Sequence, residues 1–318
     1  MTDFDKPEIY RSVLEALPTG VYLVDRHRRI VFWNSGAERI CGYLRQDVVG
    51  RFLREHLYAT YEGVETGGEE WDPLNQVLRD GKSSTVRVSI LHKDGYRVPI
   101  ILKTVPIRND RGEIVGAAEC FDDNAASAGK SRRKQAFGRL ICLDEITGLP
   151  SKISMETHLR ERIAQVAERH GDFSITLVAV DQLDQITAAR GQGVIHSILR
   201  VVAHTVENSL RPRDTAGAWG GNRFMVALPD CREENLESVA SRLRRMISQS
   251  EVEWWGDRFA VTVSLGGASC RPDDTLESLV ERAEKGLVVS AAAGGNQVTV
   301  VGLSRGRGEE DRDGCLQS

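Results

Sequence analysis

The sequence predicts an α+β protein made of two domains joined by a linker. Its 318 residues suffice for about two domains, each large enough for its own core. In both halves, runs with strand-like alternation lie between stretches with helical spacing. Small, polar and basic residues interrupt these patterns in the middle. We therefore expect a first domain over residues 8–122, a helical linker over 123–143, a second domain over 144–303 and a disordered tail over 304–318.

The composition is ordinary for a globular protein and excludes several function classes. Apolar residues make up 41% and charged residues 28%, and the formal net charge of −4 gives no electrostatic basis for nucleic-acid binding. We expect no membrane span, because no run of about eighteen apolar residues exists, and the N-terminus lacks a secretory signal. The scattered cysteines favour reduced thiols in a cytoplasmic protein over disulfides or a zinc site. They are Cys41, Cys120, Cys142, Cys231, Cys270 and Cys315.

The first domain is predicted to contain a helix, a hairpin, small helices and three further strands. Polar turns at Lys93–Gly95 and Asn109–Gly112 separate the last three strands. The predicted helices are Ile9–Leu17, Ala37–Tyr43 and Pro73–Leu78, and the predicted strands are Gly20–Asp25, Arg29–Asn34, Ser84–His92, Arg97–Ile107 and Ile114–Asp122.

Three segments of this domain resemble those of a PAS sensor domain. They are Gly20 with Asp25 five residues later, the run Ile30–Asn34 with Ala37-Glu38-Arg39 behind it, and His92-Lys93-Asp94-Gly95-Tyr96-Arg97-Val98-Pro99. The resemblance implies a PAS fold, an antiparallel sheet with short helices, that senses a signal. The sequence predicts no particular cofactor or ligand for it.

The linker joins a basic run, Lys130–Lys134, to apolar residues at helical spacing, Phe137, Leu140 and Ile141. This pattern predicts a connecting helix that pairs with a second copy of itself in a homodimer. A solvated helix face accounts for the basic run better than nucleic-acid or lipid binding does.

The second domain is predicted to begin near Asp144 and to centre on a hairpin. Trp219 and the apolar run Met225–Leu228 flank Gly220-Gly221-Asn222-Arg223-Phe224, and the two glycines predict a tight turn. The predicted helices are Met155–Ala167, Gly193–Leu210, Asn235–Ile247 and Leu276–Ala291, and the strands outside the hairpin are Ile175–Asp181, Phe259–Leu265 and Gln297–Val301.

The pentapeptide Gly220–Phe224 resembles the turn that names the GGDEF domain, the diguanylate cyclase family. Two other segments resemble the family in the expected order: Asp144–Lys152 is similar to its DxLTGLxNR segment, and Ser264–Ala268 to its SxGxA. The resemblance covers residues 144–301. It implies a nucleotide-cyclase-like domain with the ferredoxin-like order βααββαβ.

A diguanylate cyclase joins two GTP molecules across a dimer, using two divalent metals held by carboxylates. On the family pattern those carboxylates fall on Ala179, Asn222 and Arg223, which changes the formal charge from about −3 to about +1. We therefore expect no metal site, and no acidic side chain in the pocket beside the turn. A shift of two residues would place Asp181 on the metal position, but it leaves Asn222 and Arg223 unchanged.

The other nucleotide contacts implied by the resemblance are also replaced. The base-reading positions fall on Thr187 and His196, and the phosphate-holding positions on Ala291 and Gly295. Losses at the metal, base and phosphate positions together indicate a cyclase scaffold without the chemistry.

One family feature is retained. Arg211-Pro212-Arg213-Asp214 ends six residues before Gly220, which matches the RxxD inhibitory site in sequence and spacing. The resemblance implies that Arg211 and Asp214 bind cyclic di-GMP, with Arg242 from the following helix as a third ligand-binding residue. A surface pair that caps a helix end explains the same short pattern equally well.

Three functions stay open on the sequence. The first is a catalytically inactive signalling protein that binds cyclic di-GMP, or a protein partner, under control of a PAS sensor. The second is an active diguanylate cyclase with unusual ligands. The third is a scaffold that only pairs with other proteins.

Overall fold

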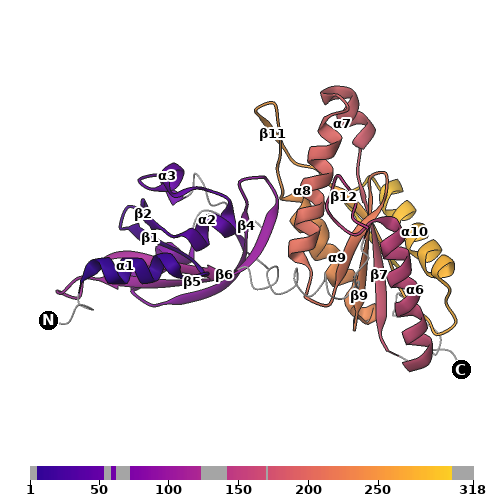
Figure 1. Ribbon diagram of the computed structural model, residues 1–318, viewed down its shortest axis with the longest axis horizontal. Coiled ribbons are helices and arrows are strands. Elements are labelled where there is room, and N and C mark those ends of the chain that lie inside the picture. Colours follow the sequence, from indigo (N-terminus) through magenta and orange to yellow (C-terminus); the bar gives the residue numbers. More distant parts are fainter. Residues whose placement is uncertain (1–5, 54–58, 62–71, 123–141, 170, 303–318) are drawn as a thin grey trace, which may run out of the picture.

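The computed structural model of the chain has two lobes joined end to end (Figure 1). It describes residues 6–53, 59–61, 72–122, 142–169 and 171–302. The predicted linker helix and the predicted disordered tail fall almost entirely outside these residues. The first lobe holds a six-stranded sheet, and the second holds a five-stranded sheet with a separate two-stranded ribbon.

The first lobe is one antiparallel sheet with short helices on it. The strand order is β2-β1-β6-β5-β4-β3, so the first hairpin joins the last strand at its edge. The strands are β1 (Gly20–Asp25), β2 (Ile30–Trp33), β3 (Ala59–Tyr61), β4 (Ser84–Leu91), β5 (Arg97–Arg108) and β6 (Ile114–Asp122). The helices are α1 (Pro7–Ala16), α2 (Ser35–Cys41), α3 (Arg45–Val48) and α4 (Pro73–Asp80). This arrangement is the predicted PAS fold.

Asn34 fixes the N-terminal part of this lobe. Its carboxamide oxygen accepts from the backbone N–H groups of Val21 and Ala37, both at 2.8 Å, which caps α2 and ties it to β1. Its amide nitrogen donates to Leu14 O at 2.8 Å and Thr19 O at 2.9 Å. One buried side chain therefore satisfies four backbone groups and holds α1 against the sheet.

A carboxyl group is buried in the core of this lobe. Glu119 accepts hydrogen bonds from Tyr22 and, at 2.6 Å, from Thr104, and only 2% of its surface is exposed. Burial raises the pKa of Glu119, although the two hydrogen bonds oppose this.

Because the pKa of Glu119 is raised on folding, its protonated form is the one that favours the folded state. The contribution is full below the unfolded value of 4.5 and is lost as pH rises through the folded pKa. We therefore expect Glu119→Gln to gain stability relative to wild type as pH increases, in urea unfolding of the first lobe at several pH values. Glu113→Gln, at an exposed turn, is the matched control. A pH-independent difference between Glu119→Gln and wild type would contradict the assignment.

The second lobe is a three-layer domain. Its sheet has the order β13-β12-β7-β9-β8, with β12 and β13 parallel and the other pairs antiparallel. The strands are β7 (Phe173–Val180), β8 (Thr215–Gly220), β9 (Arg223–Pro229), β12 (Val263–Ser269) and β13 (Val298–Val301). The helices are α6 (Lys152–Arg169), α7 (Leu183–Arg190), α8 (Val194–Ser209), α9 (Glu233–Ser248) and α10 (Leu276–Ala292). From β7 to β12 the elements follow the predicted order βααββαβ once the two-stranded ribbon between α9 and β12 is left aside.

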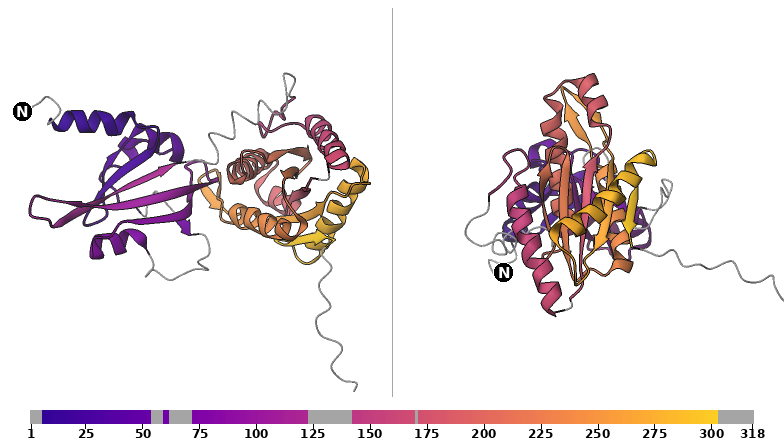
Figure 2. Two further views of the ribbon diagram at one scale, coloured as in Figure 1. Left: turned by 90° about the horizontal axis from the view of Figure 1, so that it is seen from below. Right: turned by 90° about the vertical axis from the view of Figure 1, so that its right-hand side faces the viewer.

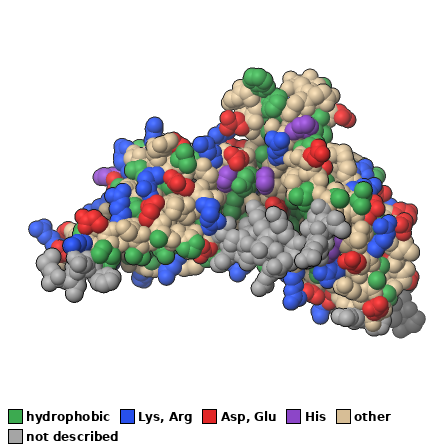
Figure 3. Space-filling view, in the orientation of Figure 1, with side chains coloured by type: hydrophobic (Ala, Val, Ile, Leu, Met, Phe, Trp, Pro, Cys, Tyr) green, Lys and Arg blue, Asp and Glu red, His purple; other side chains and the backbone are tan. Residues whose placement is uncertain are grey.

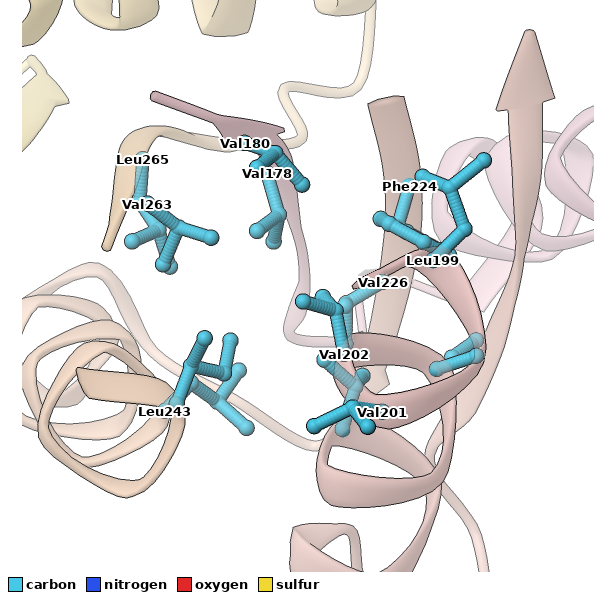
Figure 4. Packing of buried hydrophobic residues seen from close by; sticks show 14 of the residues in the cluster. Val178, Val180, Leu199, Val201, Val202, Phe224, Val226, Leu243, Val263 and Leu265 are labelled. Carbon is cyan, nitrogen blue, oxygen red and sulfur yellow. The ribbon is translucent and has the colours of Figure 1, made fainter. Parts of the chain in front are cut away.

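Helices cover both faces of this sheet (Figure 2). Alternate residues of β7 serve the two cores: Val178 and Val180 pack with α8 and α9, and Ile175 and Leu177 pack with α6 and α10. The strand is therefore buried along nearly its whole length, and Ser174 and Thr176 are the only polar residues in it, as expected for a strand covered on both sides. Figure 4 shows Val178 and Val180 facing Leu243 of α9 and the side chains of α8.

One predicted strand is wrong. The expected strand Phe259–Leu265 is two elements: the end of a ribbon formed by β10 (Val252–Trp254) and β11 (Asp257–Phe259), and the separate strand β12. Trp255 and Gly256 both have positive φ, 52° and 86°, which is the backbone of a tight hairpin turn. The two tryptophans gave no sign of this turn in the sequence. Helices α3 and α7 were not predicted, because each is too short to show a clear helical period of apolar residues.

Candidate functional site

The hairpin turn lies at one end of the second sheet, between β8 and β9. Gly220 and Gly221 have φ of 101° and 61°, conformations that favour glycine, and the register of the pair shifts between Ala218 and Gly220. The predicted tight turn is therefore present, and it projects Asn222 and Arg223 toward the end of β7.

Asn222 locks this turn onto β7. Its Nδ2 donates to Val180 O at 2.8 Å, and its backbone oxygen accepts from Val180 N at 3.1 Å. A carboxylate at position 222 would place one hydrogen-bond acceptor against another, the Val180 carbonyl oxygen. Such a contact requires a proton or a cation between the two oxygens. The amide supplies the donor from the chain itself.

Ala179 and Arg223 are directly opposite each other in the β7–β9 register. The methyl group of Ala179 packs on the face covered by α6 and α10, and the guanidinium of Arg223 lies 3.5 Å from Glu284 of α10. The structure thus brings the three predicted metal positions to one end of the sheet. There they present a methyl, an amide and an ion-paired guanidinium.

A pocket of 660 Å³ opens beside the turn. It is lined by the turn itself, by the first turns of α7 and α8, and by the segment before α6. Two carboxylates, Asp144 and Asp184, line it, so the expectation of a pocket without acidic side chains is wrong. Asp144 accepts from Thr147 N at 2.9 Å and Thr147 Oγ1 at 2.7 Å, so it acts as a local cap.

The residues present do not fit a pair of divalent metals. Across the described parts of the chain, no three side chains of His, Cys, Asp or Glu gather closely enough to hold a metal ion. Asp181 is the acidic residue nearest in sequence to Ala179. Its carboxylate accepts hydrogen bonds from Thr262 Oγ1 at 2.8 Å, Ser264 Oγ at 2.7 Å and Asn296 N at 2.8 Å. Its carboxylate joins β7 to β12 and to the loop before β13.

Of the four positions predicted for base and phosphate contacts, only one lines the pocket. His196 lines the pocket, whereas the hydroxyl of Thr187 donates to Leu183 O within α7. Gly295 lies against Asp181, so that a side chain there would meet the carboxylate at 3.0 Å. Ala291 is on α10 and does not line the pocket. Asp184 and Gln182 line the pocket but were missed, since neither belongs to a motif that marks chemistry.

The three predicted ligand-binding residues converge on the loop after α8. Asp214 is buried, and its Oδ2 accepts from Arg211 N at 2.9 Å, which closes a turn between them. Arg242 of α9 donates from Nη2 to Ser209 O at 3.0 Å, at the end of α8. Arg211 itself is exposed to solvent. Asp214 thus shapes the loop that carries Arg211.

No helix in the described residues is long and apolar enough to cross a membrane. The cysteines within these residues are free.

Comparison with known proteins assigns both lobes. Residues 8–121 match the PAS fold, and residues 141–297 match the family described as diguanylate cyclase, GGDEF domain. "Probable diguanylate cyclase DgcE" of Escherichia coli is 23% identical over 267 residues, which cover 83% of this chain and 23% of that protein. "Diguanylate cyclase A" of Treponema denticola is 30% identical over 161 residues, which cover 49% of this chain and 43% of that protein.

A solved structure shares the fold of the second lobe. The diguanylate cyclase SiaD of Pseudomonas aeruginosa, in complex with its activator SiaC, aligns with a TM-score of 0.51 at 24% identity, over 54% of this chain and 66% of that chain. The chain spans less than half the length of the two curated relatives above. It belongs to the diguanylate cyclase family of signalling proteins, with a PAS domain ahead of its GGDEF domain.

Proposed function

We propose that this protein is a catalytically inactive member of its family that binds cyclic di-GMP and acts as a receptor or regulatory partner under control of its PAS domain. The observation that carries the proposal is the register of β7 and β9, which places Arg223 opposite Ala179 where the family has carboxylates.

Electrostatics supports the loss of catalysis. A guanidinium ~4 Å from a divalent cation is repelled by roughly 8 kcal/mol at an effective dielectric of 20, although exposure of Arg223 reduces this figure. Asp144 and Asp184 lie on the pocket side, while Ala179 packs on the opposite face of the sheet. These acids are therefore poorly placed to substitute for the missing ligands.

The loop after α8 supports a receptor role. Arg211 in this loop and the guanidinium of Arg242 lie at one corner of the domain, and guanidinium groups pair with phosphates and guanine edges. The burial of Asp214 favours a role in holding this loop over direct contact with guanine. The ligand class is a cyclic dinucleotide with two phosphates.

Calorimetry with cyclic di-GMP tests the receptor function. We expect saturable binding that Arg211→Ala reduces at least tenfold, because a charge-assisted contact to phosphate or guanine is lost. Arg213→Ala is the matched control: Arg213 lies in the same loop, is exposed, and pairs with Asp230 at 2.9 Å. Absence of heat at high ligand concentration, or equal losses in both variants, would overturn the receptor function.

Two further assays on the same purified protein test the alternative functions, an active cyclase and a scaffold. Steady production of cyclic di-GMP from GTP with Mg²⁺ or Mn²⁺ would establish an active cyclase instead. A protein partner retained equally by wild type and Arg211→Ala in pull-down would favour the scaffold. We propose that the chain is a homodimer in each case, as the apolar spacing of the linker predicts.

A further inference from the structure

A turn of the PAS domain is docked on the GGDEF domain. We call residues 92–97, which run from the end of β4 to the first residue of β5, the docked turn. Glu251 N donates to Gly95 O at 2.8 Å, Arg97 N donates to Thr205 Oγ1 at 3.3 Å, and Arg97 Nε donates to Gln249 O at 2.8 Å. The partners lie at the end of α8 and in the loop after α9. Arg97 is 4% exposed, so the contact is a buried interface and not a surface touch.

An aromatic stack closes this interface. The ring of Tyr96 lies 4.2 Å from that of His92, nearly parallel to it, and 4.9 Å from that of His204 on α8. Tyr96 also packs against the core clusters of both domains. Figure 3 shows histidine and hydrophobic side chains gathered where the two lobes meet.

The backbone of the docked turn suits this contact closely. Gly95 has φ of 87°, and a Cβ there would lie 1.7 Å from Glu251 O. Only glycine combines that conformation with so close an approach. The turn is also anchored within its own domain, since Lys93 N donates to Cys41 O at 2.9 Å.

Buried hydrogen bonds run from the docked turn toward the proposed ligand site. Thr205 Oγ1, which accepts from Arg97, also lies 2.9 Å from Ser250 Oγ. One turn further along α8, Ser209 Oγ donates to Thr205 O at 2.6 Å, and Ser209 O accepts from Arg242. Thr205, Ser209 and Ser250 are all at most 3% exposed. The docked turn and Arg242 therefore hold the same last turns of α8.

We propose that the docked turn is a regulatory contact between the domains: it holds the end of α8, and ligand binding at Arg211 and Arg242 loosens or tightens it. The docking itself is independent of any nucleotide, whereas the coupling rests on the proposed function. Signals then pass between PAS core and ligand site through α8, besides any route through the linker.

Hydrogen exchange on the full chain tests the docking. The Glu251 amide should be protected in wild type, and its exchange should accelerate at least tenfold in Tyr96→Ala and in His204→Ala. These variants remove one ring from each side of the interface, so a shared effect does not depend on one domain failing to fold. The double variant should add little to either single change. Arg87→Ala, at an exposed position of β4, is the matched control and should leave exchange unchanged.

Unprotected Glu251 in wild type, or protection that survives in both single variants, would overturn the docking. The coupling is read by adding cyclic di-GMP. Exchange at Glu251 should change by at least threefold in wild type and stay constant in Arg211→Ala. Binding seen by calorimetry without any change at Glu251 would overturn the coupling alone. Failure to bind in calorimetry would count against the receptor function, while the ligand-free exchange still decides the docking.

Discussion

The triple variant Ala179→Asp, Asn222→Asp, Arg223→Glu is expected to bind Mn²⁺ at least tenfold more tightly than wild type. It replaces a methyl, an amide and a guanidinium with three carboxylates at one end of the sheet, where β7 and β9 place them together. Hard divalent cations prefer such oxygen ligands, and the repulsion from Arg223 is removed at the same time. Titration followed by electron paramagnetic resonance of Mn²⁺ measures the change directly.

The triple variant also makes the protein more negative, and any added acidic residue attracts cations weakly. This general charge effect needs its own control. Arg213→Glu makes the same substitution at an exposed arginine of the same domain, and it should leave Mn²⁺ binding unchanged. Wild-type protein that already binds Mn²⁺ as tightly as the triple variant would show that the site is intact by another route. Asp144 or Asp184 would then be the first residues to replace.

The second large effect is expected at Gly266 on β12. A Cβ there would lie 2.0 Å from Ala283 O and 2.2 Å from Leu287 N, both in the backbone of α10. Because helix and strand backbones cannot move apart cheaply in a packed core, Gly266→Val should destabilise the GGDEF domain by about 3 kcal/mol or more. Urea unfolding followed by circular dichroism gives the difference.

The matched control is Gly171→Val. Gly171 is exposed, and a Cβ there would meet nothing within 4 Å. Its cost should stay within about 0.5 kcal/mol, as for other surface changes. Equal losses at Gly171 and Gly266 would mean that valine's backbone preference, and not the close approach to α10, sets the cost.

Much of the fold could be predicted because its signals are local. The mainly apolar composition of β7 and the helical spacing of α8, α9 and α10 reflect burial, which a sequence displays directly. The β10–β11 ribbon could not be predicted in the same way. Its turn depends on Trp255 taking a positive φ, which tryptophan rarely does and which Gly256 beside it permits.

The site could be predicted only where residues follow the hairpin motif. Gly220, Gly221, Asn222 and Arg223 were found from their order, and the β-ladder shows Ala179 opposite Arg223. Asp144 and Asp184 join the pocket from segments about 40 residues apart. Asp144 begins the recognised segment Asp144–Lys152, but nothing in that motif indicates that it lines the pocket, and nothing local marks Asp184. The partners of the docked turn are more than one hundred residues away in sequence, a separation that no spacing rule reaches.

The docked turn shares one chain with the surface that receives it, and this sets its strength. A few hydrogen bonds and a ring stack contribute about 0.5–1.5 kcal/mol each, so separate domains would hardly associate. Covalent connection supplies an effective concentration on the order of millimolar, which keeps the attached population in excess although each contact is weak. A change of about 1.4 kcal/mol still shifts the ratio of attached to detached molecules tenfold. A contact too weak to purify as a complex is then well suited to respond to a small molecule.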